Sequence, residues 1–134
     1  MIRELDLRTL VGGQIQAADM PHLKASGVTM IVCNRPDGED EGQPTAAEIE
    51  SAAEAEGIGF RHVPIIRGIG PSDVEAMQEA MDTADGKLLF YCRSGNRSAL
   101  TWAVARRGRG ASIEEVQSAV SGAGFDLSPV EHLL

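Results

Sequence analysis

The sequence predicts one α/β domain, residues 1–134, with a mainly parallel central sheet of about 4–5 strands and helices on both faces. Short apolar, β-branched segments alternate with segments of helical periodicity along the whole chain. A chain of 134 residues suits one hydrophobic core, and no repeat, low-complexity tract or interdomain linker interrupts it. The apolar share of 43% is that of a globular protein.

Three strands and two helices are expected in the first half of the chain. The β-branched, apolar run 28–34 predicts a buried strand. Thr45 with Glu48 three residues later forms a capping box, and Gly57 is suited to end the helix that Thr45 begins. Gly27 ends the preceding helical pattern in the same way. The expected elements are strands at 3–7, 10–13 and 28–34 and helices at 19–26 and 45–57.

The second half continues the alternation. Pro71 opens one helix, and Ser112 with Glu115 three residues later forms a second capping box. Ligands of such sheets bind beyond the carboxyl ends of the parallel strands. The expected elements are strands at 58–65 and 88–91, helices at 71–84, 97–107 and 112–122, and a short helix after Pro129.

The most informative segment follows the strand at 88–91. Cys92 ends this strand, a polar turn with Gly95 follows, and Arg97 comes at the start of the next helix. A strand–loop–helix of this kind aims several backbone N–H groups at one point beside the positive end of a helix, which favours a thiolate there. Arg97 adds a planar guanidinium that suits oxyanions. We therefore expect a nucleophilic thiolate in an anion-binding loop, with chemistry on a phosphorus or sulfur oxyanion or on a persulfide.

Four residues between Cys92 and Arg97 are candidates for surrounding the bound anion. Gly95 is suited to a positive φ or to close approach of the ligand, and Asn96 tolerates the left-handed conformation of a turn. Arg93 on the rim either recruits an anionic donor or is a solvated side chain. The candidate substrate-binding residues of the loop are Arg93, Ser94, Gly95 and Asn96.

A second candidate position lies at the end of the strand 28–34. If the two strand ends are neighbours, Cys33 is a candidate resolving thiol for Cys92, although a buried core residue is the simpler interpretation. Arg35 either reaches the anion or pairs with Asp37 or Glu39.

The spacing from Cys92 to Arg97 is Cys-x4-Arg, and with Arg-Ser-Gly-Asn inside it resembles the active-site loop of rhodanese-type sulfurtransferases. Cysteine-dependent phosphatases carry Cys-x5-Arg, which is longer by one residue. The rest of the chain resembles dual-specificity-phosphatase-like domains, in Val11-Gly12-Gly13-Gln14, in residues 23–28 and in Ile31-Val32-Cys33-Asn34-Arg35-Pro36-Asp37. The chain is similar to a short bacterial family, described as sulfurtransferase or phosphatase-like, that combines this scaffold with the short loop.

The resemblance implies a cysteine-dependent-phosphatase-like fold and a role for Ser98. In the phosphatase-like loops a hydroxyl after the arginine donates to the cysteine sulfur; the alternative for Ser98 is an ordinary serine of the first helical turn. The phosphatase-like group also supplies an aspartic general acid from the loop after a middle strand. Asp73 is the nearest candidate in the matching region, although it is better explained as part of a helix start, and Asp37 with the acids at 39–41 is an alternative.

The leading hypothesis from the sequence is a sulfurtransferase that forms a persulfide on Cys92, with a small anionic sulfur donor such as thiosulfate and an acceptor thiol or cyanide. The short loop and the missing acid favour it, because sulfite or a thiolate leaves without protonation. The alternative is a cysteine-dependent phosphatase that cleaves a phosphate ester through a thiophosphate on the same cysteine. A further alternative is a non-catalytic module that binds an anion or senses redox state.

Composition limits the partners. The net charge of −8 argues against nucleic acid and anionic membranes, and no apolar run approaches the length of a spanning helix. Two cysteines without a signal-peptide pattern suggest the cytoplasm. We expect no metal and no cofactor, because the histidines lack ligand spacing and no dinucleotide or Walker motif is present. The oligomeric state stays open.

Overall fold

Five strands form one sheet in the order β1-β2-β5-β3-β4 in the computed structural model, which describes residues 1–134. Strands β2, β5, β3 and β4 pair in parallel, and only β1 at the edge is antiparallel to its neighbour. The strands are β1 (Ile2–Asp6), β2 (Thr9–Gly12), β3 (Val28–Cys33), β4 (Gly59–His62) and β5 (Lys87–Tyr91). The predicted α/β class with a mainly parallel sheet is confirmed.

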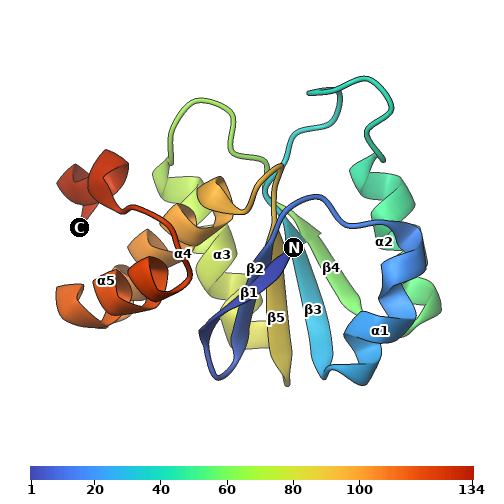
Figure 1. The fold of residues 1–134 in the computed structure, drawn as a ribbon, viewed down its shortest axis with the longest axis horizontal. Helices are drawn as coiled ribbons and strands as arrows, with labels where there is room; N and C mark the ends of the chain where they lie inside the picture. Colours follow the sequence, from blue (N-terminus) through green and yellow to red (C-terminus); the bar gives the residue numbers. More distant parts are fainter.

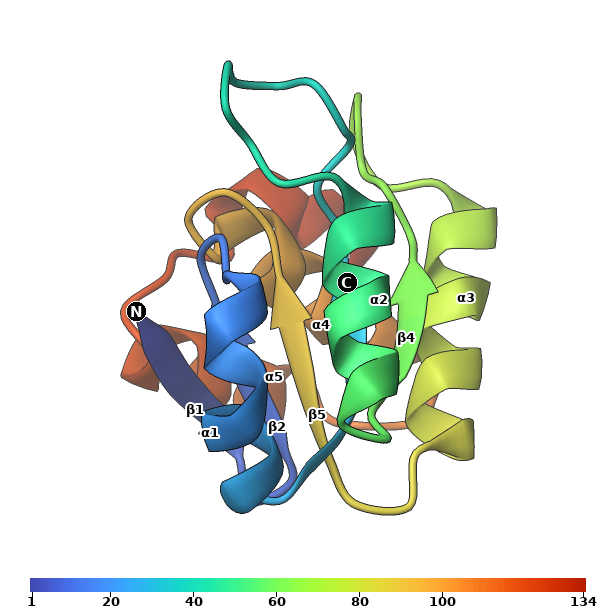
Figure 2. The same ribbon diagram turned by 90° about the vertical axis from the view of Figure 1, so that its right-hand side faces the viewer.

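Helices cover both faces of the sheet (Figures 1 and 2). Helices α1 and α2 pack on one face, and α3, α4 and α5 pack on the other, as the composition of the two apolar clusters shows. The helices are α1 (Met20–Ala25), α2 (Ala46–Ala55), α3 (Pro71–Thr83), α4 (Asn96–Gly108) and α5 (Ile113–Gly122), with 3-10 helices η1 (Ala17–Asp19) and η2 (Ser128–Leu133).

Two of these helices begin at the predicted N-cap residues, although the return contact from the glutamate side chain that would complete each predicted capping box is not formed. The Thr45 hydroxyl accepts a hydrogen bond from the Glu48 N–H at 3.1 Å and begins α2. The Ser112 hydroxyl accepts from the Glu115 N–H at 3.1 Å and begins α5. Each contact satisfies a backbone donor that has no partner inside its own helix.

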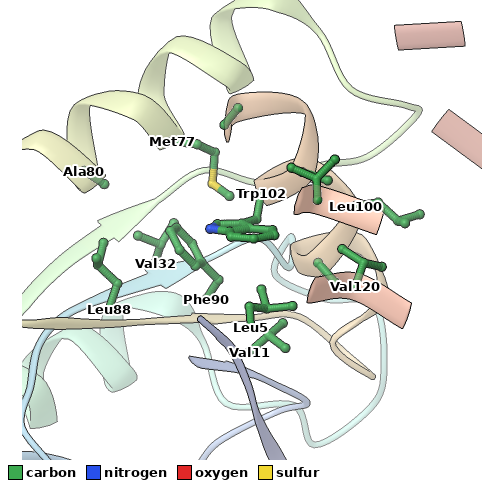
Figure 3. Packing of buried hydrophobic residues seen from close by; sticks show 14 of the residues in the cluster. Leu5, Val11, Val32, Met77, Ala80, Leu88, Phe90, Leu100, Trp102 and Val120 are labelled. Carbon is green, nitrogen blue, oxygen red and sulfur yellow. The ribbon is translucent and has the colours of Figure 1, made fainter. Parts of the chain in front are cut away.

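The larger core layer lies between the sheet and helices α3, α4 and α5. Trp102 of α4 is buried at its centre, with Phe90 of β5 and Met77 of α3 in the same apolar cluster (Figure 3). Residues alternate along β5, so Leu88 and Phe90 face this layer while Leu89 and Tyr91 face α1 and α2. This alternation is the reason why every residue of β5 after Lys87 is buried.

Two predicted elements differ from the structure. Strand β4 ends at His62 instead of residue 65, because its partner β3 ends at Cys33, which pairs with His62. The segment still follows β3, since Val63 and Ile65 donate to the carbonyls of Cys33 and Asn34 at 2.8 and 3.0 Å. The helix expected at 19–26 is shorter and is preceded by the separate turn η1.

Three loops gather at the end of the sheet where the parallel strands finish. They are residues 34–45 after β3, 63–70 after β4 and 92–95 after β5, and Figures 1 and 2 show them at the top of the molecule. The Cys92 loop is therefore at the edge of the sheet where ligands of α/β proteins bind. None of the helices is sufficiently long and apolar to span a membrane.

Candidate active site

The Cys92 thiol lies in a closely packed loop between β5 and α4. The Cys92 residue is only 1% exposed, and its N–H donates to the Gly12 carbonyl at 3.2 Å. The Gly95 N–H donates to the Cys92 Sγ at 3.1 Å. Gly95 has a φ of +95°, and a Cβ at this position would lie 3.1 Å from Phe125 Cζ. Glycine is required here by both its backbone conformation and the available space.

The helix start beside the thiol offers further donors. Helix α4 begins at Asn96, and its first intrahelical hydrogen bond runs from Ala99 N–H to the Gly95 carbonyl at 2.9 Å. The N–H groups of Arg97 and Ser98 make no hydrogen bond within the protein. Free N–H groups at the positive end of a helix are suited to an anion. The arrangement agrees with an anion-binding loop, and its occupancy stays a prediction.

Ser98 lies on the first turn of α4 and is completely buried. Its hydroxyl has no hydrogen-bond partner, and the same is true of the buried side-chain oxygen of Asn34, at the end of β3. A buried polar atom without a partner costs free energy. The hydrogen bond expected from Ser98 to the Cys92 sulfur is not formed in this structure, and the role of Ser98 stays a prediction.

The loop is supported from behind by residues 12–14. The Gln14 N–H donates to the Arg93 carbonyl at 3.4 Å, so this carbonyl of the Cys92 loop points toward residues 12–14. A Cβ on Gly13 would lie 2.9 Å from the same carbonyl oxygen, closer than side chains tolerate. The resemblance included Gly13 and Gln14, but their support of the loop was not anticipated from the sequence.

The change Gly13→Ala is expected to push the Arg93 carbonyl and shift the Cys92 loop. Because misplacement by about 1 Å can cost 10²-fold in rate, we expect kcat/KM to fall at least about tenfold while the protein stays folded. Steady-state kinetics and a thermal melt would measure both. Gly122→Ala is the matched control, since a Cβ there meets nothing within 4 Å. Equal kinetics for the two variants would show that the loop tolerates the shift.

Arg97 is oriented by Glu39 from the loop after β3. The Arg97 Nη1 and Nη2 donate to the two Glu39 oxygens at 2.7 and 2.8 Å, and Nη1 also donates to the Ile65 carbonyl at 3.0 Å. These contacts use the outer edge of the guanidinium. The Nε–H and the second N–H of Nη2 form the other edge, which neither Glu39 nor Ile65 contacts and which can hold two oxygens of an anion.

Glu39 is held ionised. Hydrogen bonds from Arg97, followed by those from Arg35, lower the pKa of Glu39 to about 2. The same pairing raises the pKa of Arg97. Because its pKa is lowered on folding, Glu39 stabilises the folded state above its usual value of 4.5, and this contribution is lost as the pH falls through about 2. At neutral pH this carboxylate orients Arg97 and has no proton to donate.

The other two predicted arginines join the same network. Arg35 is 3% exposed and donates to Glu39 at 2.9 Å, to Asp40 at 2.6 Å and to the Gln14 side chain at 2.9 Å. Of the alternatives for Arg35, pairing with Glu39 is confirmed. Arg93 is largely exposed on the loop rim and reaches Asp40 at 3.1 Å. The loop after β3 is thus connected to all three arginines by two carboxylates.

The change Glu39→Gln is expected to lower kcat/KM about tenfold, because an amide cannot accept from both Arg97 nitrogens and removes the charge that orients them. The loss should appear mainly in kcat if Arg97 acts on the transition state. Glu41→Gln is the control, since it removes the same charge from an exposed residue of the same loop. Similar effects from both variants would show that Glu39 acts only through general electrostatics.

The carboxylates of both candidate general acids already accept hydrogen bonds from backbone N–H groups at helix starts. The Asp73 carboxylate accepts from the Gly70 N–H at 2.8 Å and caps α3, and the Asp37 carboxylate accepts from the Ala46 N–H at 2.8 Å at the start of α2. The interpretation of Asp73 as part of a helix start is confirmed. Neither position gains structural support as a general acid.

Cys33 belongs to the opposite core layer. It is 2% exposed among the side chains that face α1 and α2, and its thiol donates to the Arg35 carbonyl at 3.3 Å. Burial raises the pKa of Cys33, and burial together with the neighbouring Cys33 raises the pKa of Tyr91. Both Cys33 and Cys92 are free thiols. These properties are those of a core residue, and a resolving role for Cys33 stays a prediction without support.

Comparisons with known proteins place this geometry in a family. Residues 2–109 match the family described as "Beta-lactamase hydrolase-like protein, phosphatase-like domain". The beta-lactamase hydrolase-like protein of Agrobacterium fabrum is 35% identical over 123 residues, which cover 90% of this chain and 28% of that protein. That of Xylella fastidiosa Temecula1 is 30% identical over 128 residues, which cover 94% of this chain and 30% of that protein. The chain thus spans less than a third of the length of these relatives.

Solved structures agree with the fold. A Neisseria meningitidis protein described as a candidate phosphatase is 34% identical, with a TM-score of 0.83 and coverage of 97% of this chain and 94% of that chain. Human DUSP28 is 22% identical, with a TM-score of 0.69 and coverage of 96% and 88%. At that identity the second likeness shows the fold alone. These comparisons support the phosphatase alternative better than the predicted sulfurtransferase. The chain belongs to the phosphatase-like domain family of the beta-lactamase hydrolase-like proteins.

Proposed function

We propose that this domain is a cysteine-dependent phosphatase that acts on phosphate monoesters, with Cys92 as the nucleophile and Arg97 as the anion-binding residue. The observation that carries the proposal is the combination of the Cys92 sulfur with the free edge of the Arg97 guanidinium. Family membership supports phosphate over sulfur as the transferred group.

The reaction would proceed in two steps. The Cys92 thiolate attacks phosphorus, an S–P bond forms, and the bond from phosphorus to the leaving oxygen breaks. Loop N–H groups and Arg97 stabilise the charge on the phosphoryl oxygens. Water then attacks phosphorus, releases inorganic phosphate and restores the thiolate, while the proton of the water passes to solvent.

The carboxylates around the site suggest which esters would react. Glu39 is ionised, and Asp37 and Asp73 are used as helix caps. A phosphatase without a positioned acid is slow with alkyl esters, whose alkoxide leaving group needs a proton. Aryl esters leave as weakly basic aryloxides. We therefore expect aryl phosphates to be the better substrates.

The test is a series of aryl phosphates whose leaving groups differ in acidity, with an alkyl phosphate as the comparison. We expect kcat/KM to rise steeply as the leaving group becomes more acidic, and the alkyl ester to react at least about 10²-fold more slowly than the nitrophenyl ester, the size of effect that general acid catalysis supplies. A flat dependence would indicate a working general acid. If none of the esters were hydrolysed, the result would contradict the proposed function.

Sulfur transfer is the second candidate because of one specific observation. The Cys-x4-Arg loop is one residue shorter than the phosphatase loop, and sulfur transfer needs no general acid. Incubation with thiosulfate or glutathione persulfide followed by intact mass would detect a sulfur added to Cys92, with Cys92→Ser as the control. Persulfide formation without phosphate hydrolysis would reverse the order of the two candidates. If neither reaction were detected, the result would favour a non-catalytic anion-binding module.

A further inference from the structure

A cavity of about 340 Å³ lies beside the Cys92 loop. Four segments that are far apart in the sequence form it: the start of β1, the end of β2, the Cys92 loop and the residues after α5. Figure 2 shows the start of β1 next to the segment between α5 and η2. Arg93 and Ser94 in the wall of the cavity belong to the Cys92 loop, so the cavity and the candidate active site share this loop.

The cavity is basic, although the protein as a whole is acidic. Arg3 and Arg93 line it and no carboxylate does, in a chain with a net charge of −8. The larger cavity, of about 530 Å³ at the other end of the sheet, has Asp6 and Asp82 in its wall together with arginines. Two guanidinium groups in a recess without a carboxylate attract an anion. The charge of the cavity beside the Cys92 loop therefore suits an oxyanion.

Arg3 is held in place while most of its N–H groups stay free. Its Nη1 donates to the Ala123 carbonyl at 2.5 Å, and its guanidinium carbon lies 5.6 Å from the centre of the Phe125 ring. Its Nε donates to the Met1 sulfur, a weak acceptor, and its Nη2 makes no hydrogen bond within the protein. Residue 124 has to be glycine here, because its φ is +90° and a Cβ would collide with Arg3 Nη1. A guanidinium fixed in this way loses little freedom when it binds an anion.

The Cys92 loop supplies donors on its own side of the cavity. Arg93 Nε lies 3.1 Å from an Asp40 oxygen, and the two Nη groups of Arg93 make no hydrogen bond within the protein. The Ser94 oxygen accepts from the Asn96 N–H at 3.4 Å, and the Ser94 O–H is left to donate. Ser94 comes two residues after Cys92, so their Cα atoms are at most about 7 Å apart. One small molecule is therefore long enough to reach both the thiol and this cavity.

We propose that this cavity binds a second acidic group of the substrate, a phosphate or a carboxylate, and selects phosphate monoesters that carry such a group over esters of a neutral alcohol or phenol. This inference rests on the proposed function. The phosphoryl group would occupy the Cys92 loop and Arg97, and the second oxyanion would accept from Arg3 and Arg93. A neutral organic group would gain no charge-assisted hydrogen bond there.

The test measures binding without catalysis, with ligands that have no ester bond to hydrolyse. The ligands are alkane bisphosphonates with one to four methylene groups, and the alkylphosphonates and phosphonocarboxylates of the same chain length. We expect calorimetric titration to show a chain length at which the bisphosphonate binds at least about tenfold more tightly than the alkylphosphonate, the size of effect of hydrogen bonds to a charged group. The phosphonocarboxylate of that length should gain less, because a carboxylate carries less charge than a phosphonate.

Variants of Arg3 separate this cavity from the loop. Arg3→Gln should reduce the ratio to about threefold or less and leave the affinity for the alkylphosphonate unchanged. Arg61→Gln is the matched control, because it removes the same charge from a partly exposed arginine of β4, at the opposite edge of the sheet. Arg3→Lys should keep part of the preference, since an ammonium retains the charge without the planar fork. Thermal melts would confirm that all three variants stay folded.

Equal affinities of the wild type for bisphosphonate and alkylphosphonate at every length, or failure to bind either, would overturn the inference. So would a preference that Arg3→Gln and Arg61→Gln lower alike, because it would reflect net charge. Two alkylphosphonates bound per protein molecule, with no gain from linking two phosphonates in one ligand, would indicate a separate anion site and would also overturn it. A preference for the bisphosphonate without hydrolysis of any ester would support the cavity and contradict the proposed function. Hydrolysis of aryl phosphates without this preference would do the reverse.

Discussion

Replacement of Cys92 by serine is expected to reduce turnover by 10⁴-fold or more, on the order of the loss seen when a nucleophile is removed. Cys92 is 1% exposed, and serine is smaller, so the loop keeps its shape and the loss reflects chemistry. A hydroxyl in place of the thiol is not ionised near neutral pH and attacks phosphorus poorly. The measurement is steady-state kinetics with an aryl phosphate together with rapid-quench intact mass, which should detect a phosphorylated wild type and no adduct on Cys92→Ser.

Cys33→Ser provides the matched control. Cys33 is the other free thiol, it is similarly buried, and it lies in the core layer that faces α1 and α2. We expect this variant to keep turnover close to that of the wild type. Loss of turnover in Cys33→Ser with a stable fold would indicate that Cys33 takes part in the reaction. Full activity of Cys92→Ser would contradict the assignment of the nucleophile.

Arg97→Ala is expected to lower kcat/KM by about 10²–10³-fold, as does the removal of a donor that stabilises transition-state charge. The free edge of this guanidinium is the only part of Arg97 that is left for an anion, because Glu39 and the Ile65 carbonyl use the other edge. Arg97→Lys should recover only part of the loss, because an ammonium cannot contact Glu39 and the anion with the same planar fork. The measurement is kcat and KM for both variants, with thermal melts.

The control for Arg97 must separate lost chemistry from lost packing. Arg109→Ala removes an arginine that pairs with Asp82 at 2.7 Å on the surface, and exposed pairs contribute little to stability. We expect it to change neither kinetics nor stability by much. If Arg97→Ala lowered the melting temperature strongly and left kcat/KM per folded molecule unchanged, Arg97 would be a structural link between loops and not an anion-binding residue.

Helix starts and buried strands were predictable because their signals are local. Thr45 and Ser112 cap helices through hydroxyls that act within three residues, and the apolar run before Cys92 forms β5. The strand expected to reach residue 65 was too long, because its end depends on where the neighbouring strand β3 stops, and an apolar run does not reveal that. The expectation of sulfur transfer gave weight to the loop being one residue shorter than in phosphatases. The comparisons do not support this expectation.

The sequence by itself determined the nucleophile candidate, the arginine and the class of fold, since these depend on spacing within one strand–loop–helix and on periodicity. Only the tertiary structure decided how the site is supported. Glu39 and Arg97 are 58 residues apart, yet their ion pair orients the guanidinium and leaves one edge free. The support of the Cys92 loop by Gly13 likewise comes from a segment that meets the loop only after the sheet has formed. Such contacts follow from the order of strands and not from local patterns, because parallel neighbours are distant in the chain.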